Sequence, residues 1–180
     1  EYNDFYKNKF YDYEDPAVVI HTRTEGNATF NALLFIPSHA PMNYYSTSYE
    51  KGLQLYSRGV LIMEKCADLL PDYFSFVRGL VDSEDLSLNI SREMLQHDRQ
   101  LQLIERALER RIKGELEKLL ENDREKYEAL WKEFGTQLTY GLCIDYGMHK
   151  DTLQDLQLFY SSTEKKLTTL KEYVGRMKEG

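Results

Sequence analysis

Residues 81–96 read Val81-Asp82-Ser83-Glu84-Asp85-Leu86-Ser87-Leu88-Asn89-Ile90-Ser91-Arg92-Glu93-Met94-Leu95-Gln96. An apolar, strand-like run from Phe74 to Val81 leads into this acidic, polar loop. The loop then continues into a long amphipathic segment. Ser91 is the best candidate for its N-cap, because a serine hydroxyl can accept a free backbone N–H there. The stretch therefore predicts a strand, a loop and a long helix that begins at Arg92.

Arg92 is an unusual first residue for such a helix. The helix macrodipole presents its positive end at this position, where a cation costs about 0.3–1 kcal/mol. Free backbone N–H groups and a guanidinium together form a natural receptor for an anion such as phosphate. Alternatively, the arginine forms an ion pair with an acid of the preceding loop, namely Asp82, Glu84 or Asp85. Spacing alone favours the ion pair, and both interpretations remain open.

Composition narrows the class of protein. The chain has 180 residues, which is long enough for one core, or for one core and a smaller lobe. Its formal net charge of −7 argues against a general nucleic-acid binder, which needs a basic surface. No run of about 18 apolar residues predicts a membrane-spanning helix. Cys66 and Cys143 form neither a CxxC pair nor a disulfide framework, which favours the reducing cytoplasm.

In the first half of the chain, segments with the two-residue apolar spacing of a strand alternate with segments that have the apolar spacing of a helix. Strand-like patterns occupy 17–23, 28–36, 52–62 and 74–81, and helix-like patterns occupy 1–10 and 66–73. The turn Glu25-Gly26-Asn27 joins the first two strands into a predicted hairpin. Because strands and helices are interleaved, the sequence predicts a layered α/β domain in which helices cover a sheet.

The second half is mostly helical. Leucines and isoleucines at three- and four-residue steps from Leu95 to Leu120 predict one face of a long helix. Asn122-Asp123 offers the cap of a second helix, a third is expected over about 150–158, and strand character follows over 158–160. Thr169 and Glu172 have the spacing of a capping box that opens the last helix.

These patterns predict an α/β architecture in three parts. A large α-β-α lobe over 1–119 carries the 81–96 loop. A helical connector follows over 120–149. The start of a small second α-β-α lobe occupies 150–180 and is expected to be incomplete at its C-terminus.

The loop Pro41-Met42-Asn43-Tyr44-Tyr45-Ser46-Thr47-Ser48-Tyr49 is unusually aromatic for a connection. One interpretation is that it folds down as a lid on its own domain. The other is that Met42, Tyr44 and Tyr45 make adaptable contacts with apolar surfaces, for which Met and Tyr side chains are well suited. The sequence favours neither.

Signatures of a self-contained enzyme are missing. The sequence has no G-x-S-x-G, no H-E-x-x-H and no P-loop. Its four histidines lack the spacing of metal ligands, and the loop acids lack the glycine and final glutamate of a calcium loop. We therefore expect this segment alone to be inactive, without a metal or cofactor of its own.

A resemblance to a known family covers essentially the whole chain. It is strongest at Phe76-Val77-Arg78-Gly79-Leu80-Val81-Asp82-Ser83-Glu84-Asp85-Leu86 and at Leu88-Asn89-Ile90-Ser91-Arg92-Glu93-Met94-Leu95-Gln96. It continues, in the same order along the chain, at 1–7, 33–37, 66–71 and 173–177. These segments resemble the heat-shock protein 90 family of molecular chaperones, especially the middle domain of its bacterial, HtpG-type members. Ser87 departs from the proline usual in relatives, and the Tyr44–Tyr49 loop is particular to this chain.

The resemblance implies a function. Members are cytoplasmic homodimers that use ATP and Mg²⁺, bound mainly by an N-terminal ATPase domain, and that dimerise through a C-terminal domain. It implies that Arg92 reaches the γ-phosphate of that ATP and that Gln96 supports the same catalytic loop. It further implies that Met42, Tyr44 and Tyr45 face unfolded or partly folded client proteins, with no role for nucleic acid or membrane. The alternative is a non-catalytic protein-docking module.

Overall fold

The computed structural model describes residues 1–87, Glu93 and 98–177, and at Asp145 it describes the backbone alone. Arg92 and Gln96, the two residues expected to act on ATP, lie outside these ranges. The chain separates into two compact units, Glu1–Ile112 and Lys113–Gly180.

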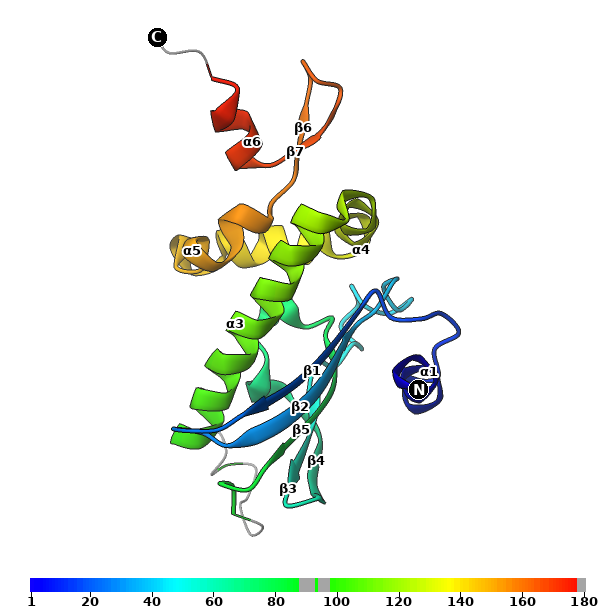
Figure 1. Ribbon diagram of the computed structural model, residues 1–180, viewed down its shortest axis with the longest axis vertical. Helices are drawn as coiled ribbons and strands as arrows, with labels where there is room; N and C mark the ends of the chain where they lie inside the picture. The colour runs from blue at the N-terminus through cyan, green and yellow to red at the C-terminus, as the bar shows by residue number, and fades with distance from the viewer. Residues whose placement is uncertain (88–92, 94–97, 178–180) are drawn as a thin grey trace. The chain divides into compact units, whose positions relative to one another are not determined.

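The described part of the first unit is built on a five-stranded sheet. Its strands are β1 (Val18–Thr24), β2 (Phe30–Ile36), β3 (Leu53–Ser57), β4 (Val60–Cys66) and β5 (Arg78–Ser83). The strand order is β1-β2-β5-β3-β4, as Figure 1 shows. Neighbouring strands are antiparallel except β3 and β5, which are parallel. The predicted mixed α/β class and the predicted first hairpin are thereby confirmed.

Two local predictions were wrong. The single strand expected over 52–62 is a hairpin, because Arg58 and Gly59 adopt positive φ values of 50° and 77° and turn the chain back. The helix expected over 66–73 is a pair of 3₁₀ turns, Ala67–Leu69 and Asp72–Phe74. Pro71 lies between them and has no N–H with which to continue a helix. As a result, β5 begins at Arg78 rather than at 74.

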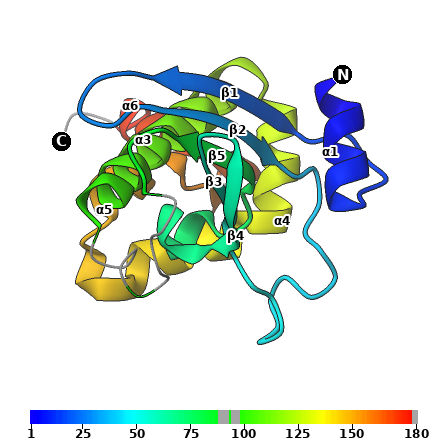
Figure 2. The same cartoon turned by 90° about the horizontal axis from the view of Figure 1, so that it is seen from below.

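Helices cover this sheet. The helix α1 (Tyr2–Phe10) packs its aromatic rings around Phe35 of β2, with Tyr6 and Phe35 ring centroids 5.1 Å apart. The first half of α3 (Arg99–Asn122) runs along the sheet, as Figures 1 and 2 show. Within the first unit, four side chains of the predicted stripe of α3 are buried: Leu101, Ile104, Leu108 and Ile112.

The second unit begins within α3, at Lys113. Its elements are α4 (Arg124–Cys143), the 3₁₀ turn Ile144–Gly147, α5 (Lys150–Leu153), the 3₁₀ turn Gln154–Leu156, β6 (Phe159–Ser161), β7 (Lys166–Thr168) and α6 (Leu170–Gly175). Asp123 caps α4 by accepting the Lys126 N–H at 3.1 Å, and Thr169 and Glu172 form the predicted capping box. The predicted third helix is shorter than expected, because its α-helical part ends at Leu153.

Arg124 forms hydrogen bonds that link three elements of this second unit. Its Nε donates to Glu128 Oε1 at 2.8 Å, its Nη1 to Glu172 Oε1 at 2.9 Å and its Nη2 to the Leu167 carbonyl at 3.0 Å. One guanidinium therefore binds α4, β7 and α6, which suits its rigid fork of donors. Among the described helices of both units, none combines the length and the apolar character that crossing a membrane requires.

Candidate functional site

The end of β5, where the chain leaves the sheet toward residue 92, is bound to the β1–β2 hairpin. Ser83 is fully buried, and its Oγ donates to the Thr29 carbonyl at 2.8 Å. Asp85 Oδ2 accepts the N–H of the same Thr29 at 2.6 Å. The amide and the carbonyl of Thr29 are thus both hydrogen-bonded to side chains from the end of β5.

The β3–β4 hairpin binds the same segment from the other side. Ser57, also fully buried, donates its Oγ proton to the Leu86 carbonyl at 2.7 Å. In the turn of that hairpin, the Gly59 N–H donates to Asp82 Oδ2 at 3.0 Å. Residues 82–86 are therefore hydrogen-bonded to both hairpins, and we call this set of bonds the exit brace.

The exit brace bears on the ion pair that spacing favoured for Arg92. Two of the three candidate acids already accept backbone amides, Asp82 from Gly59 and Asp85 from Thr29. The third, Glu84, is exposed. Since a carboxylate bound to an amide is partly satisfied, an arginine gains less from pairing with Asp85 than the sequence suggested. Asp82 differs, because its Oδ1 is buried and has no hydrogen-bond partner among the described residues.

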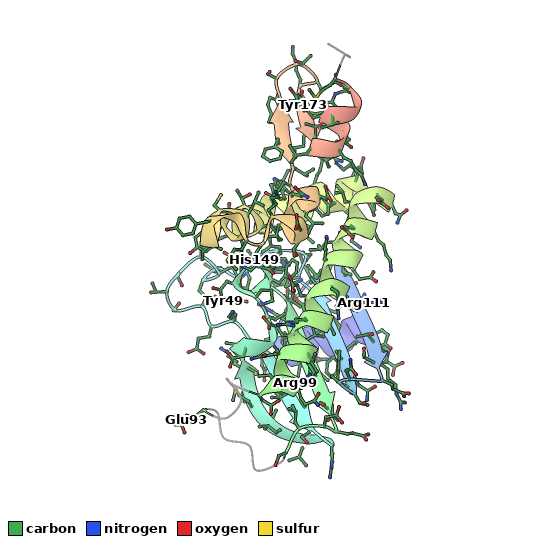
Figure 3. The ribbon with its side chains drawn as sticks, turned by 90° about the vertical axis from the view of Figure 1, so that its left-hand side faces the viewer. Tyr49, Glu93, Arg99, Arg111, His149 and Tyr173 are labelled. Atoms are coloured by element: carbon green, nitrogen blue, oxygen red, sulfur yellow. The ribbon has the colours of Figure 1, made fainter. Side chains whose placement is uncertain are left out.

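The long helix begins later than predicted. It starts at Arg99, and its cap is Asp98, whose Oδ1 accepts the Leu101 N–H at 2.9 Å. Aspartate is among the best N-cap residues, which accounts for this start. Glu93 is helical and exposed but lies before α3 (Figure 3). The positive end of the α3 dipole is therefore at Arg99, so the dipole argument made for Arg92 does not apply to this helix.

The aromatic loop is partly buried on its own domain, and Tyr44, which the resemblance placed among the client-facing residues, is one of its buried side chains. Tyr44 is only 5% exposed and its hydroxyl hydrogen-bonds Ser75 Oγ at 2.8 Å, while Tyr49 donates to the Ser75 carbonyl at 2.8 Å (Figure 3). Burial raises the pKa of the Tyr44 hydroxyl. Met42, at 108%, and Tyr45, at 57%, are exposed. The loop is thus held to the domain by Tyr44 and Tyr49 and presents Met42 and Tyr45 outward.

Comparison with known proteins places this arrangement in a family. A sequence model described as "Hsp90 protein" matches residues 1–180. The chain belongs to the Hsp90 family. Its fold matches the solved middle domain of a heat shock protein from Plasmodium falciparum, with a TM-score of 0.84 and 29% identity. That match covers 99% of this chain and 69% of the solved one.

Curated Hsp90 relatives are closer in sequence. The chain is 60% identical over 179 residues to the protein named "Chaperone protein HtpG" from Alkaliphilus metalliredigens, and equally to the one from Bacillus subtilis. The protein of that name from Clostridium botulinum is 59% identical. Each alignment covers 99% of this chain but 29% of the relative. The chain therefore spans under a third of the length of these relatives.

Reasoning from the sequence did not identify one buried carboxylate of this Hsp90 segment, that of Asp12. The Asp12 side chain is 5% exposed and accepts the Tyr6 hydroxyl at 2.7 Å and the Glu14 N–H at 3.2 Å. His39 Nε2 lies 3.5 Å from it and Arg78 Nη1 lies 3.6 Å from it. Asp12 thereby joins α1, the segment between β2 and the aromatic loop, and β5. No local motif marks it, since its partners come from four separate segments.

Asp12 is expected to make the stability of the first unit depend on pH in the acidic range. Burial alone would raise its pKa, but the bonds from Tyr6 and Glu14 and the charges of His39 and Arg78 outweigh burial and hold it below the usual 3.8. A carboxylate with a depressed pKa stabilises the fold above its unfolded pKa and loses that contribution as pH falls through the folded value. We expect the unfolding free energy to decline below about pH 4. Denaturant titrations from pH 6 to 2 should show a smaller decline in Asp12→Asn, and an identical decline would contradict this.

Proposed function

We propose that this chain is the middle segment of an ATP-dependent, HtpG-type chaperone. The supporting observation is that the family match extends over residues 1–180 while the fold matches a solved Hsp90 middle domain. In this proposal the complete protein is a cytoplasmic homodimer. Its N-terminal domain holds ATP and Mg²⁺, and its C-terminal domain dimerises.

Within this proposal Arg92 is the residue that acts on the nucleotide. A guanidinium binds phosphate oxygens through several directed N–H donors, and an arginine supplied from a second domain stabilises charge during phosphoryl transfer. Gln96 supports the same loop. The described residues contain no group of His, Cys, Asp and Glu that could hold a metal ion, and the sequence has no phosphate-binding glycine loop.

The experiment that tests this role is ATP turnover by the full-length protein carrying Arg92→Ala. A docking module without a catalytic share predicts unchanged turnover and intact partner binding in the same variant. The two candidate functions thus predict opposite results. The docking alternative is supported by the exposure of Met42 and Tyr45, which also fits client binding by a chaperone.

We also propose that Met42 and Tyr45 contact unfolded or partly folded clients. Replacing both with serine should weaken client affinity about tenfold, because roughly 1.4 kcal/mol of apolar contact would be lost. Stability should change little, since both side chains are exposed. Binding of a fluorescent unfolded protein to the full-length chaperone is the measurement.

The matched control removes an exposed apolar side chain elsewhere in the first unit. Val60 on β4 is 54% exposed, close to the value for Tyr45. Val60→Ser therefore tests whether the loss of any exposed apolar side chain lowers client affinity. Equal affinity of the Met42/Tyr45 double variant and wild type would remove these residues from the client surface. Tyr44→Phe should bind clients normally, because Tyr44 is buried.

A further inference from the structure

The exit brace joins parts of the chain that are distant in sequence. The Asp85–Thr29 bond connects residues 56 positions apart, and the Ser57–Leu86 bond connects residues 29 positions apart. The two bonds come from opposite hairpins and converge on consecutive residues. Together they restrict both the position and the direction of the backbone at Leu86.

These bonds act beyond the sheet itself. The β2–β5 ladder already pairs Phe30 with Ser83, the last residue of β5. Asp85 and Leu86 follow the ladder, so their bonds do not serve strand pairing. The Asp85 bond to the Thr29 amide is 2.6 Å long and has a charged acceptor, and it lies at an exposed position where water competes with it. The Ser57–Leu86 bond lies in a buried environment, where water competes poorly.

We propose that Asp85, together with Ser57, is a positioning residue for ATP hydrolysis. The two side chains fix the point from which the chain runs on to Arg92. This inference rests on the proposed function. Arg92 follows Leu86 closely enough that even an extended chain spans only about 20 Å between them. In this inference a displaced starting point displaces the guanidinium as well, and a misplacement of about 1 Å at a reacting group can cost roughly 100-fold in rate.

The simpler explanation is that the brace only stabilises the end of the sheet. In that case, losing Asp85 should resemble losing any carboxylate that accepts a backbone amide. Asp123, which accepts the Lys126 N–H at the start of α4, provides a matched comparison in the second unit. Both substitutions remove one such acceptor, but only Asp85 borders the segment that leads to Arg92.

The experiment measures kcat and KM for ATP in the full-length protein carrying Asp85→Ala, Asp85→Asn or Asp123→Ala. Asp85→Ala should lower kcat about 10- to 100-fold with KM unchanged, because ATP is held by another domain. Asp85→Asn should stay within about threefold of wild type, since its amide oxygen still accepts the Thr29 N–H. Asp123→Ala should lose thermal stability but keep its kcat.

Three results would overturn the positioning role: equal kcat in Asp85→Ala and Asp123→Ala, a raised KM in place of a lowered kcat, or no rescue by asparagine. Should Asp85→Ala fail to fold, Ser57→Ala removes the second bond of the brace and must lower kcat in the same way. A drop in turnover for Arg92→Ala, with normal kcat in both brace variants, would overturn only this inference. Normal turnover in Arg92→Ala would overturn the proposed function itself.

Discussion

Replacing Arg92 with alanine in the full-length protein is expected to lower ATP turnover by about 10³-fold or more. Arginines supplied from one domain to a nucleotide in another contribute on this scale, because their charge meets negative charge that grows on the phosphoryl oxygens. ATP affinity should change much less, since the nucleotide is held by the N-terminal domain in the proposed arrangement. Steady-state turnover and equilibrium ATP binding, measured on the same preparations, separate these two effects.

Two further variants make this test specific. Arg92→Lys keeps the charge but loses the planar fork of donors, so its turnover should lie between those of wild type and Arg92→Ala. Arg99→Ala removes an exposed arginine at the first residue of α3 (Figure 3) and should stay within twofold of wild type. Turnover within twofold of wild type in Arg92→Ala itself would exclude the catalytic role.

Replacing Gly79 with alanine should destabilise the first unit by about 3 kcal/mol. Gly79 lies in β5 opposite Leu34 of β2, and its φ of +146° is rarely adopted by residues with a side chain. An added Cβ would lie 2.2 Å from the Leu33 carbonyl oxygen and 2.8 Å from Leu34 Cα. Both contacts are with backbone inside a sheet, so neither side can move without breaking the ladder. Chemical denaturation of the chain measures the loss.

Two other glycines separate the causes of this loss. Gly26 also has a positive φ, +135°, but a Cβ there would meet nothing within 4 Å, so Gly26→Ala reports the backbone strain alone. Gly114 lies within α3 with open space around it, and Gly114→Ala should stabilise the helix by about 0.5–1 kcal/mol. If Gly79→Ala lowers the free energy of unfolding no more than Gly26→Ala does, the close approach of β2 does not contribute to the loss.

Local sequence patterns were sufficient for several elements. The β1–β2 hairpin, the buried stripe of α3 and the Thr169–Glu172 capping box each depend on residues that are near one another in sequence. The turn at Arg58-Gly59 was missed because apolar residues resume directly after it and an arginine rarely takes a positive φ. The start of α3 was misplaced because Ser91 and Asp98 are both good caps, and spacing alone cannot rank them.

The exit brace and the Asp12 cluster could not be predicted from the sequence, for a different reason. The Asp12 cluster comprises Asp12 and its partners Tyr6, Glu14, His39 and Arg78. Thr29 and Asp85, or Asp12 and Arg78, become neighbours only after the strands have paired. Nothing in the residues around Thr29 distinguishes its amide as a partner for a distant carboxylate. The sequence predicted a role for the segment around Arg92, whereas the side chains that bind the backbone before it were visible only in the fold.

The Asp12 cluster also limits how far the N-terminus of the segment can be shortened for expression. Asp15-Pro16 lies in the connection between α1 and β1, where a truncation boundary would ordinarily be chosen. Removing everything before Pro16 would uncover Phe35, whose ring is covered by α1, and would leave Arg78 without its buried carboxylate. Recombinant versions of this domain should therefore retain the first helix, although it lies outside the sheet and far in sequence from Arg92.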